Sequence, residues 1–420
     1  MAQTRLEEAA GVHLMAKPAG PICNLDCSYC FYLEKEKLFP ERQRFLMSDE
    51  VLRAYVTQNI RNEPSPEVVF TWQGGEPMLR GLDFYRQAVA YQRELAGDKL
   101  IRNALQTNGV LLDDEWCAFL AESGFMVGIS LDGPREIHDA ARVDKRGRPT
   151  FDAVMNGIAL LRKHQIEFNV LVTVTNEVSK HPKEIYRFLK QQGITHIQFN
   201  PVVERVASGK EQVIGLTFAQ PGKVEPSTSS ARVSPHSVSP DAYGDFLIAI
   251  FDEWVRHDVG AVYVMNFEWA LASFMRLPAT VCLFAENCGK ALMLEHNGDV
   301  YSCDHFMYPD HRLGNLLNAE LAALANSPQQ QAFGRTKSRL PDYCQRCEVR
   351  FACQGECPKN RFATTPDGEP GLNYLCPSYK KYFTHIAKYM NAMAKLIRHG
   401  QPAALIMDAI KGPLVIHAAK

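Results

Sequence analysis

The sequence lacks long apolar runs and has no excess of charge of either sign. No stretch of its 420 residues approaches the roughly 18 apolar residues that span a bilayer. Its first residues, MAQTRLEEAAG, contain no apolar segment of signal-peptide length. Because 46 basic side chains nearly balance 47 acidic ones, no stripe for binding nucleic acid is indicated. We therefore expect a cytoplasmic protein that binds neither membrane nor nucleic acid.

Cysteine is present in unusual number and arrangement. The 12 cysteines lie in a chain without an export signal, where thiols stay reduced and metal or redox chemistry is the default role. Three fall within residues 23–30 and eight within residues 282–376. Cys117 stands alone in a helical pattern, and we interpret it as an ordinary packed thiol without a role.

The first half of the chain alternates short β-rich runs with longer helical stretches, which is typical of repeated βα units. Six strands are predicted at residues 12–16, 67–72, 100–106, 125–131, 167–174 and 194–201. Amphipathic helices are predicted at residues 49–59, 84–96, 113–123, 151–164 and 182–192. The predicted fold class is therefore α/β, a partial (β/α)6 TIM-like barrel followed by a cysteine-rich domain.

Composition divides the chain into five parts, and its length is enough for two cores. The parts are a barrel at 1–206, a Ser/Pro-rich insertion or linker at 207–240, a connecting helical segment at 241–278, a cysteine-rich domain at 279–377, and a C-terminal helix and tail at 378–420. The 207–240 segment is too rich in Ser, Pro, Gly and Thr to build a core.

Cys23, Cys27 and Cys30 have CxxxCxxC spacing directly after the first predicted strand. Three thiolates ligate three irons of a [4Fe–4S] cube and leave the fourth open to a chelating ligand. Zinc binding or core packing is the alternative, although zinc sites usually add a second ligand pair nearby. The spacing, with an aromatic residue before the last cysteine, resembles the signature of the radical S-adenosylmethionine (SAM) superfamily. That resemblance implies a cluster whose open iron chelates SAM and whose electron cleaves it to a 5′-deoxyadenosyl radical.

The second predicted strand ends in the segment Gln73, Gly74, Gly75 and Glu76. A glycine pair alone more often marks a turn. One βα unit after the cysteine loop, the segment resembles the superfamily's SAM-binding segment. The resemblance implies that backbone groups at the glycines approach the cationic amine closely, with Glu76 as a lid or supporting carboxylate.

Four further SAM contacts are implied by the same resemblance. Ser130 and Arg142 would contact the SAM ribose and carboxylate, while Tyr29 and Val203 would line the adenosine. The alternative for Ser130 and Arg142 is a turn followed by a solvated arginine.

The C-terminal cysteines are numerous enough to complete two clusters. They are Cys282, Cys288, Cys303, Cys344, Cys347, Cys353, Cys357 and Cys376. Eight thiols ligate two [4Fe–4S] cubes with none left over, and a zinc ribbon is the alternative. The pattern resembles the SPASM extension of radical SAM peptide-modifying enzymes, and so implies three [4Fe–4S] clusters in all. By that likeness Cys282, Cys288, Cys303 and Cys357 hold an inner auxiliary cluster, and Cys344, Cys347, Cys353 and Cys376 hold an outer one.

Asp304 directly follows Cys303. An aspartate is usually a solvated turn residue, but one beside a cluster ligand can be buried and act as a base. The Cys-Asp pair matches the anaerobic sulfatase-maturating enzymes, which the chain resembles over nearly its whole length outside the insertion and the tail. The resemblance implies that Asp304 takes the side-chain proton of the substrate, while His305 is structural.

The activity implied by this resemblance is oxidation of a Cys or Ser, in a sulfatase motif Cys/Ser-x-Pro-x-Arg, to Cα-formylglycine. The deoxyadenosyl radical takes a hydrogen atom from the β-carbon, and an auxiliary cluster accepts an electron. The expected partners are a sulfatase polypeptide and an external electron donor such as a flavodoxin or ferredoxin, and the protein is expected to be monomeric. The alternatives are a SPASM enzyme that cross-links or epimerises a ribosomal peptide, and a non-enzymatic iron–sulfur carrier or zinc-bound scaffold.

Overall fold

The computed structural model describes residues 11–39, 45–222 and 232–411. The remaining parts of the predicted segments lie outside the described residues: 1–10 and 40–44 of the barrel, 223–231 of the 207–240 insertion, and 412–420 of the tail. Within the described ranges, none of the helices is long and apolar enough to cross a membrane.

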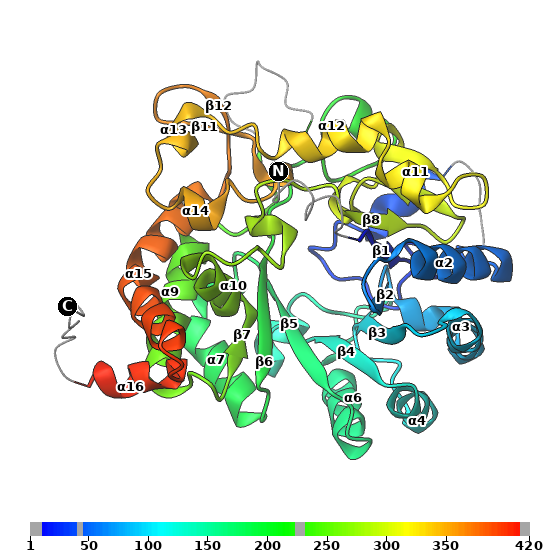
Figure 1. Cartoon of the computed structure of the whole chain (residues 1–420), viewed down its shortest axis with the longest axis horizontal. Helices are drawn as coiled ribbons and strands as arrows, with labels where there is room; N and C mark the ends of the chain where they lie inside the picture. Colours follow the sequence, from blue (N-terminus) through cyan, green and yellow to red (C-terminus); the bar gives the residue numbers. More distant parts are fainter. Residues whose placement is uncertain (1–10, 40–44, 223–231, 412–420) are drawn as a thin grey trace.

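Six parallel strands form the centre of the fold (Figure 1). They are β1 (His13–Ala16), β2 (Glu67–Trp72), β3 (Leu100–Thr107), β4 (Phe125–Ser130), β5 (Phe168–Val174) and β6 (His196–Pro201). The intervening helices are α2 (Asp49–Asn62), α3 (Leu82–Leu95), α4 (Asp114–Glu122), α5 (Arg135–Asp139), α6 (Phe151–Lys163) and α7 (Pro182–Gln191). The predicted α/β fold class is confirmed, and the strand ends differ from the prediction by no more than two residues.

Local sequence signals explain where these elements begin. Ser48 caps α2 by accepting a hydrogen bond from the backbone N–H of Val51 (3.2 Å), and Asp113 caps α4 through Trp116 N (2.8 Å). In β2, buried and more exposed side chains alternate with the period of two that is expected for a strand.

The sheet continues beyond the six predicted strands. β7 (Tyr263–Val264) pairs with β6, and β8 (Ala291–Leu294) pairs with β1 in parallel register. β9 (Asp299–Tyr301) and β10 (Arg312–Asn315) follow as antiparallel neighbours, so the order is β10-β9-β8-β1-β2-β3-β4-β5-β6-β7. The cysteine-rich region therefore covers the backbone edge of β1, which would otherwise remain unpaired.

Three long helices pack beside the last barrel strands (Figure 1). They are α9 (Ala242–His257), α10 (Met265–Phe274) and α15 (Cys376–Arg398). The remaining α-helices and strands are α8 (Lys210–Val213), α11 (Leu321–Ala325), α12 (Pro328–Thr336), α13 (Asp342–Gln345), α14 (Arg350–Cys353), α16 (Ile406–Ala409), β11 (Ala363–Thr364) and β12 (Pro370–Leu372).

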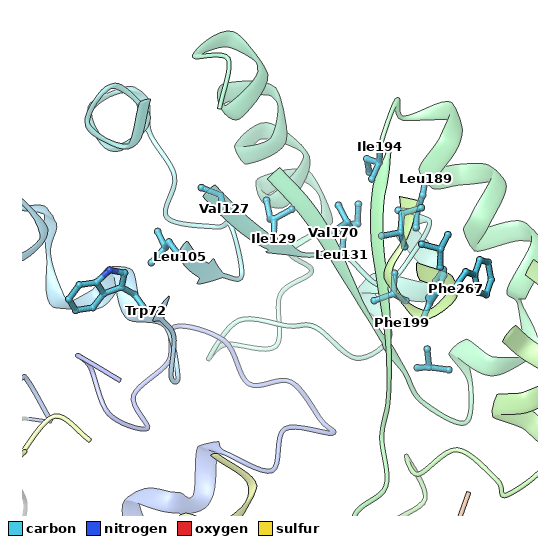
Figure 2. Packing of buried hydrophobic residues seen from close by; sticks show 14 of the residues in the cluster. Trp72, Leu105, Val127, Ile129, Leu131, Val170, Leu189, Ile194, Phe199 and Phe267 are labelled. Atoms are coloured by element: carbon cyan, nitrogen blue, oxygen red, sulfur yellow. The ribbon is translucent and has the colours of Figure 1, made fainter. Parts of the chain in front are cut away.

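The core holds the strands rigidly. Trp72 is fully buried, its Nε1 donates to Asn103 Oδ1 (2.9 Å), and the rings of Tyr55 and Tyr85 pack edge-on against it. Figure 2 shows the same buried layer continuing through Leu105, Ile129, Val170, Phe199 and Phe267. This packing fixes the strand ends from which the site residues extend.

The carboxyl ends of parallel strands meet at one mouth of a barrel. The cysteine loop follows β1 there and leads into the short 3₁₀ helix Leu33–Leu38. The described part of the 207–240 segment contacts this helix, because the Glu34 carboxylate accepts hydrogen bonds from Thr217 N (2.6 Å) and Phe218 N (2.9 Å).

Candidate active site

Cys23, Cys27 and Cys30 lie in the loop after β1 as free, partly buried thiols. Cys30 N donates to Cys27 O (3.0 Å), and the loop also bonds to the backbone of residues 141–143. Burial raises the pKa of Cys23 to about 12 and that of Cys27 to about 11, and it raises the pKa of Cys30 too. The thiols are therefore protonated when no cluster is bound, and cluster binding would release their protons.

The Gly-Gly-Glu segment after β2 packs directly on the cysteine loop. Gly75 N donates to Gly20 O (3.0 Å) and Glu76 N donates to Ile22 O (2.8 Å). A Cβ on Gly75 would lie 2.1 Å from the Ile22 carbonyl oxygen, so only glycine permits this approach. Gln73 begins the segment with its N–H bonded to Ala16 O (2.9 Å).

Glu76 is fully buried and joins three loops. Its carboxylate accepts hydrogen bonds from Met78 N (3.0 Å), Thr107 Oγ1 (2.9 Å) and Asn108 N (2.8 Å), although burial still raises its pKa to about 7. The Asn108 amide in turn donates to Asn24 Oδ1 (2.7 Å), beside the first cysteine. Glu76 thus acts in this structure as a support for the cysteine loop.

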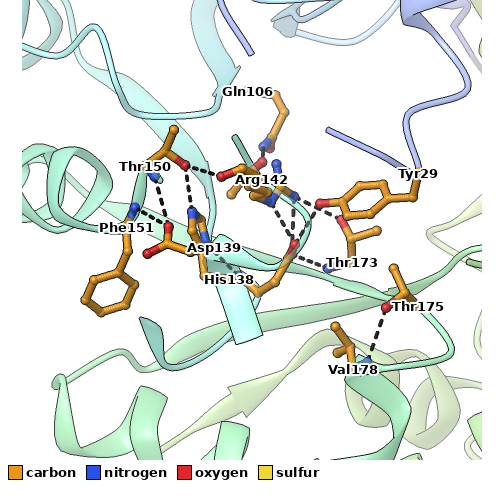
Figure 3. A network of polar contacts seen from close by, with 12 residues as sticks. Tyr29, Gln106, His138, Asp139, Arg142, Thr150, Phe151, Thr173, Thr175 and Val178 are labelled. Atoms are coloured by element: carbon orange, nitrogen blue, oxygen red, sulfur yellow. Dashed lines mark hydrogen bonds and ion pairs between the residues drawn. The ribbon is translucent and has the colours of Figure 1, made fainter. Parts of the chain in front are cut away.

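Asp132, for which no role was predicted from the sequence, brings Tyr29 and Arg142 together. Its buried carboxylate accepts hydrogen bonds from Tyr29 Oη (2.7 Å), Arg142 Nε (2.8 Å) and Thr173 N (2.8 Å). Figure 3 shows Tyr29, Arg142 and Thr173 close together in this network. Arg142 is therefore a buried, paired side chain and not a solvated one. The available sequence signal was an acidic residue just past the end of a parallel strand.

The other two predicted SAM contacts lie at neighbouring strand ends. Ser130 ends β4, and its Oγ lies 3.4 Å from the Gln106 amide nitrogen. Val203 follows β6, is buried, and accepts a hydrogen bond at its carbonyl from Lys359 Nζ (2.8 Å). Lys359 belongs to the cysteine-rich region, so this region helps to hold the end of β6.

The eight C-terminal thiols fall into two groups, and within each group the charge of one thiolate raises the pKa of its neighbours. The first contains Cys282, Cys288, Cys303 and Cys357. Burial raises the pKa of Cys288, Cys303 and Cys357, and the negative charge of the Cys282 thiolate raises each pKa further. The buried Lys337 lies beside this group and donates to the carbonyl oxygens of Cys282 and Leu283 (both 2.6 Å).

The second group lines one pocket and contains Cys344, Cys347, Cys353 and Cys376. Burial raises the pKa of Cys376 to about 11, and the neighbouring Cys344 and Cys347 contribute to this shift. Cys376 begins α15, where the helix dipole favours negative charge. The structure thus places Cys353 and Cys357 in different groups although they are close in sequence.

Asp304 begins a short 3₁₀ helix directly after Cys303. Its Oδ1 lies 2.5 Å from Nζ of Lys17, which follows β1 and is 2% exposed. Burial alone would raise the pKa of Asp304, but the charge of Lys17 holds it below its usual value. The lowered pKa keeps the Asp304 carboxylate ionised. Its side chain is 25% exposed, so a substrate can reach it. Lys17 was not foreseen from the sequence.

His305 lies beside a proposed cluster ligand, and Cys117 is a packed thiol as predicted. His305 Nδ1 is 3.6 Å from Cys357 Sγ, and burial lowers the pKa of His305 to about 4, so the ring is neutral. Cys117 is fully buried in α4 within the main core.

The donor set fits iron–sulfur clusters. Eleven free thiols, which are soft ligands suited to iron, lie in groups of three, four and four. The group of three can leave one iron open, and the other two groups can complete a cluster each. Within residues 11–39, 45–222 and 232–411, no three His, Cys, Asp or Glu side chains gather tightly enough for one metal ion.

Two family models match the chain. The Radical SAM superfamily matches residues 18–189, and SPASM, an iron-sulfur cluster-binding domain, matches residues 282–348. These families imply [4Fe–4S] clusters and SAM as cofactors, in agreement with the iron–sulfur interpretation of both cysteine regions.

Two relatives that match over most of the chain are named anaerobic sulfatase-maturating enzymes. The chain is 45% identical over 404 residues, covering 96% of both sequences, to a serine-type anaerobic sulfatase-maturating enzyme of Bacteroides thetaiotaomicron. It is 32% identical over 375 residues, covering 89% of this chain and 95% of the relative, to a cysteine-type enzyme of Clostridium perfringens.

Solved structures share the fold. Native anSMEcpe with bound AdoMet and Cp18Cys peptide superposes with a TM-score of 0.79 at 30% identity, over 92% of this chain and 99% of that one. Streptococcus suis SuiB bound to S-adenosylmethionine has a TM-score of 0.60 at 14% identity, over 89% and 80% of the two chains, which is a likeness of fold. With 45% identity over 96% of its length to one member, the chain belongs to the anaerobic sulfatase-maturating enzymes, radical SAM enzymes with a SPASM domain.

Proposed function

We propose that the protein oxidises a Cys or Ser of a sulfatase polypeptide, in the motif Cys/Ser-x-Pro-x-Arg, to Cα-formylglycine. The observation that carries this proposal is the ionised, reachable carboxylate of Asp304, paired with Lys17 and next to Cys303. The activity of the relatives and the peptide bound to anSMEcpe support a sulfatase polypeptide as substrate.

Three groups of cysteines would hold the clusters. Cys23, Cys27 and Cys30 would hold the first, with SAM on the open iron. Cys282, Cys288, Cys303 and Cys357 would hold the inner auxiliary cluster, and Cys344, Cys347, Cys353 and Cys376 the outer one. When bound, the first cluster with SAM supplies the 5′-deoxyadenosyl radical that takes a hydrogen atom from the β-carbon, and the auxiliary clusters supply a one-electron acceptor.

The SAM-binding residues are proposed from their places around the cysteine loop. Gln73, Gly74, Gly75 and Glu76 present backbone groups beside this loop, and the hydrogen bonds of Glu76 keep them there. Ser130, Arg142, Tyr29 and Val203 complete the proposed contacts. Asp132 orients two of them, because both Tyr29 and Arg142 donate to its carboxylate.

Asp304 accepts the proton of the substrate hydroxyl or thiol in this proposal. Oxidation of a serine CH₂–OH group to an aldehyde removes one hydrogen atom, one proton and one electron, so a base and an electron acceptor are both needed. A cysteine loses the same three to give a thioaldehyde, and water then replaces the sulfur, which leaves as hydrogen sulfide, to give the aldehyde. The lowered pKa of Asp304 keeps it in the form that can receive the proton.

We further propose that serine is an accepted substrate, since the relative at 45% identity is of the serine type and the cysteine-type relative is more distant at 32%. An external donor such as a flavodoxin or ferredoxin, a monomeric state, and the five-part division of the chain also belong to the proposal.

The test is an anaerobic assay of the reconstituted protein with SAM, a reductant and two synthetic peptides that differ only in Ser or Cys at the target position. We expect an aldehyde at that residue by mass spectrometry and 5′-deoxyadenosine in matching amount. A peptide with Ala at the same position is the control. SAM cleavage with a cross-linked or epimerised peptide would instead assign the protein to another SPASM chemistry.

A further inference from the structure

Lys17 is a buried cation at the barrel mouth. It directly follows β1, and its side chain is 2% exposed. Lys17 N donates to Leu294 O (2.8 Å) at the end of β8, and its carbonyl accepts from Gly20 N (3.0 Å). The backbone of Lys17 is therefore fixed between the barrel, the cysteine loop and the SPASM region.

Three contacts also fix the side chain of Lys17. Its stem passes over Gly74, where an added Cβ would lie 3.2 Å from Lys17 Cβ and 3.4 Å from Cγ. Its Nζ lies 3.4 Å from the ring centroid of Tyr32, a cation–π contact, and 2.5 Å from Asp304 Oδ1. Tyr32 is itself held, because its hydroxyl donates to Glu295. The ammonium group is thus held in one place.

Asp304 and Lys17 depend on each other. A buried ammonium is costly unless it is paired, and Asp304 is the one carboxylate within ion-pair distance of Lys17 among the residues that the structure describes. The two neighbouring lysines have other contacts: Lys35 Nζ lies over the Tyr308 ring (3.3 Å), and Lys359 pairs with Glu204 (2.5 Å). Lys17 is therefore the lysine that forms the ion pair with Asp304.

We propose that Lys17 is a positioning residue for Asp304, a role that rests on the proposed function of Asp304 as the proton acceptor. The ion pair holds Oδ1 in a fixed orientation and leaves Oδ2 to receive the substrate proton. A misplaced catalytic group loses on the order of 10²-fold in rate even when binding is intact. Lys17 would thus act on turnover and not on affinity for the peptide.

The experiment compares Lys17→Met, which keeps a stem of similar length, with Lys17→Arg, which keeps the charge. Lys163→Met is the control, because Lys163 forms an ion pair of similar length (2.6 Å) with Asp114 on the exposed surface. For each reconstituted protein, cluster content, 5′-deoxyadenosine, and the kcat and KM for formylglycine formation are measured. We expect Lys17→Met to lose ~10²-fold in kcat with unchanged KM, cluster content and SAM cleavage, and Lys17→Arg to recover part of the loss.

Three results would overturn the role of Lys17. The first is a Lys17→Met variant with the parent kcat and KM. The second is a raised KM with normal kcat, which would make Lys17 a peptide-binding residue. The third is a loss of SAM cleavage, which would make Lys17 a support of the first cluster. If the parent protein itself makes no formylglycine, the proposed function fails, and the ion pair is then tested by urea unfolding. In that assay, the double variant Lys17→Met/Asp304→Asn should have a free energy of unfolding no lower than that of the less stable single variant. Additive losses of stability would show that the two side chains are not coupled.

Discussion

The substitution Gly75→Ala tests the packing of the Gly-Gly-Glu segment on the cysteine loop. An added Cβ would lie 2.1 Å from the carbonyl oxygen of Ile22 and 2.6 Å from its carbonyl carbon, although Cβ atoms essentially never approach other atoms closer than 3.0 Å. The clash is with backbone, which cannot rotate away, so the two loops must separate by about 1 Å. The bonds from Gly75 N to Gly20 O and from Glu76 N to Ile22 O cross this contact and would stretch.

Gly75→Ala should lower the free energy of unfolding considerably. Overpacking of this kind costs ~1–3 kcal/mol, and two weakened hydrogen bonds add ~1–2 kcal/mol. Because Ile22 directly precedes Cys23, the displacement moves a proposed ligand of the first cluster. We expect the variant to lose most of the first cluster and its SAM cleavage while keeping the auxiliary clusters. Iron and sulfide analysis, electron paramagnetic resonance of the reduced protein and 5′-deoxyadenosine formation measure these effects.

Gly11→Ala is the matched control for Gly75→Ala. Its added Cβ would also meet an oxygen at 2.1 Å, but this atom is Oε2 of Glu63, the end of a flexible side chain that can move aside. The control should therefore keep all clusters and the parent rate. If Gly75→Ala also retains a full first cluster and normal SAM cleavage, the proposed dependence of the cysteine loop on this glycine is wrong.

Four further predictions follow from single residues. Asp304→Asn should lose ~10²–10⁴-fold in formylglycine formation while still producing 5′-deoxyadenosine, and a parent rate would contradict its role as base. Cys27→Ala should abolish SAM cleavage yet keep about two-thirds of the iron, in the auxiliary clusters; unchanged cleavage would refute the ligand assignment. The pKa of Glu76 is about 7 against an ordinary 4.5, so in this window the folded state binds the extra proton. In urea unfolding of the cluster-free protein, the stability of the parent relative to Glu76→Gln should therefore fall by ~3 kcal/mol as pH rises from about 4.5 to about 7. Asp132→Asn should destabilise the protein by ~3–5 kcal/mol in the same assay, because it leaves a buried arginine unpaired; a change below 1 kcal/mol would contradict that pairing.

Much of the barrel could be predicted because its signals are local. Strand β2 shows its alternation within six residues, and Ser48 and Asp113 mark helix starts by residue type alone. The pairing of β8 with β1 could not be predicted, since it joins a four-residue strand to one far away in the sequence and no local pattern encodes that partner. The same holds for the continuation of the sheet into β9 and β10.

Site residues could be proposed from the sequence where spacing within one segment carries the signal. The cysteines of the first loop and the Cys303-Asp304 pair are of this kind. Lys17 and Asp132 were missed, because their importance comes from contacts across the fold: Lys17 reaches Asp304 from the opposite half of the chain, and Asp132 joins groups from three different loops and strands. A lysine after a strand and an aspartate in a turn look ordinary until their partners are known.

Oxidation at the β-carbon is tested most directly by following the hydrogen atom that is removed from it. A Ser-x-Pro-x-Arg peptide carrying deuterium at the serine β-carbon would be incubated anaerobically with the reconstituted protein, SAM and a reductant, and both products would be analysed by mass spectrometry. We expect formylglycine in the peptide and deuterium in 5′-deoxyadenosine in matching amounts. Deuterium that stays in the peptide while 5′-deoxyadenosine forms, or transfer only from an α-deuterated peptide, would contradict oxidation at the β-carbon.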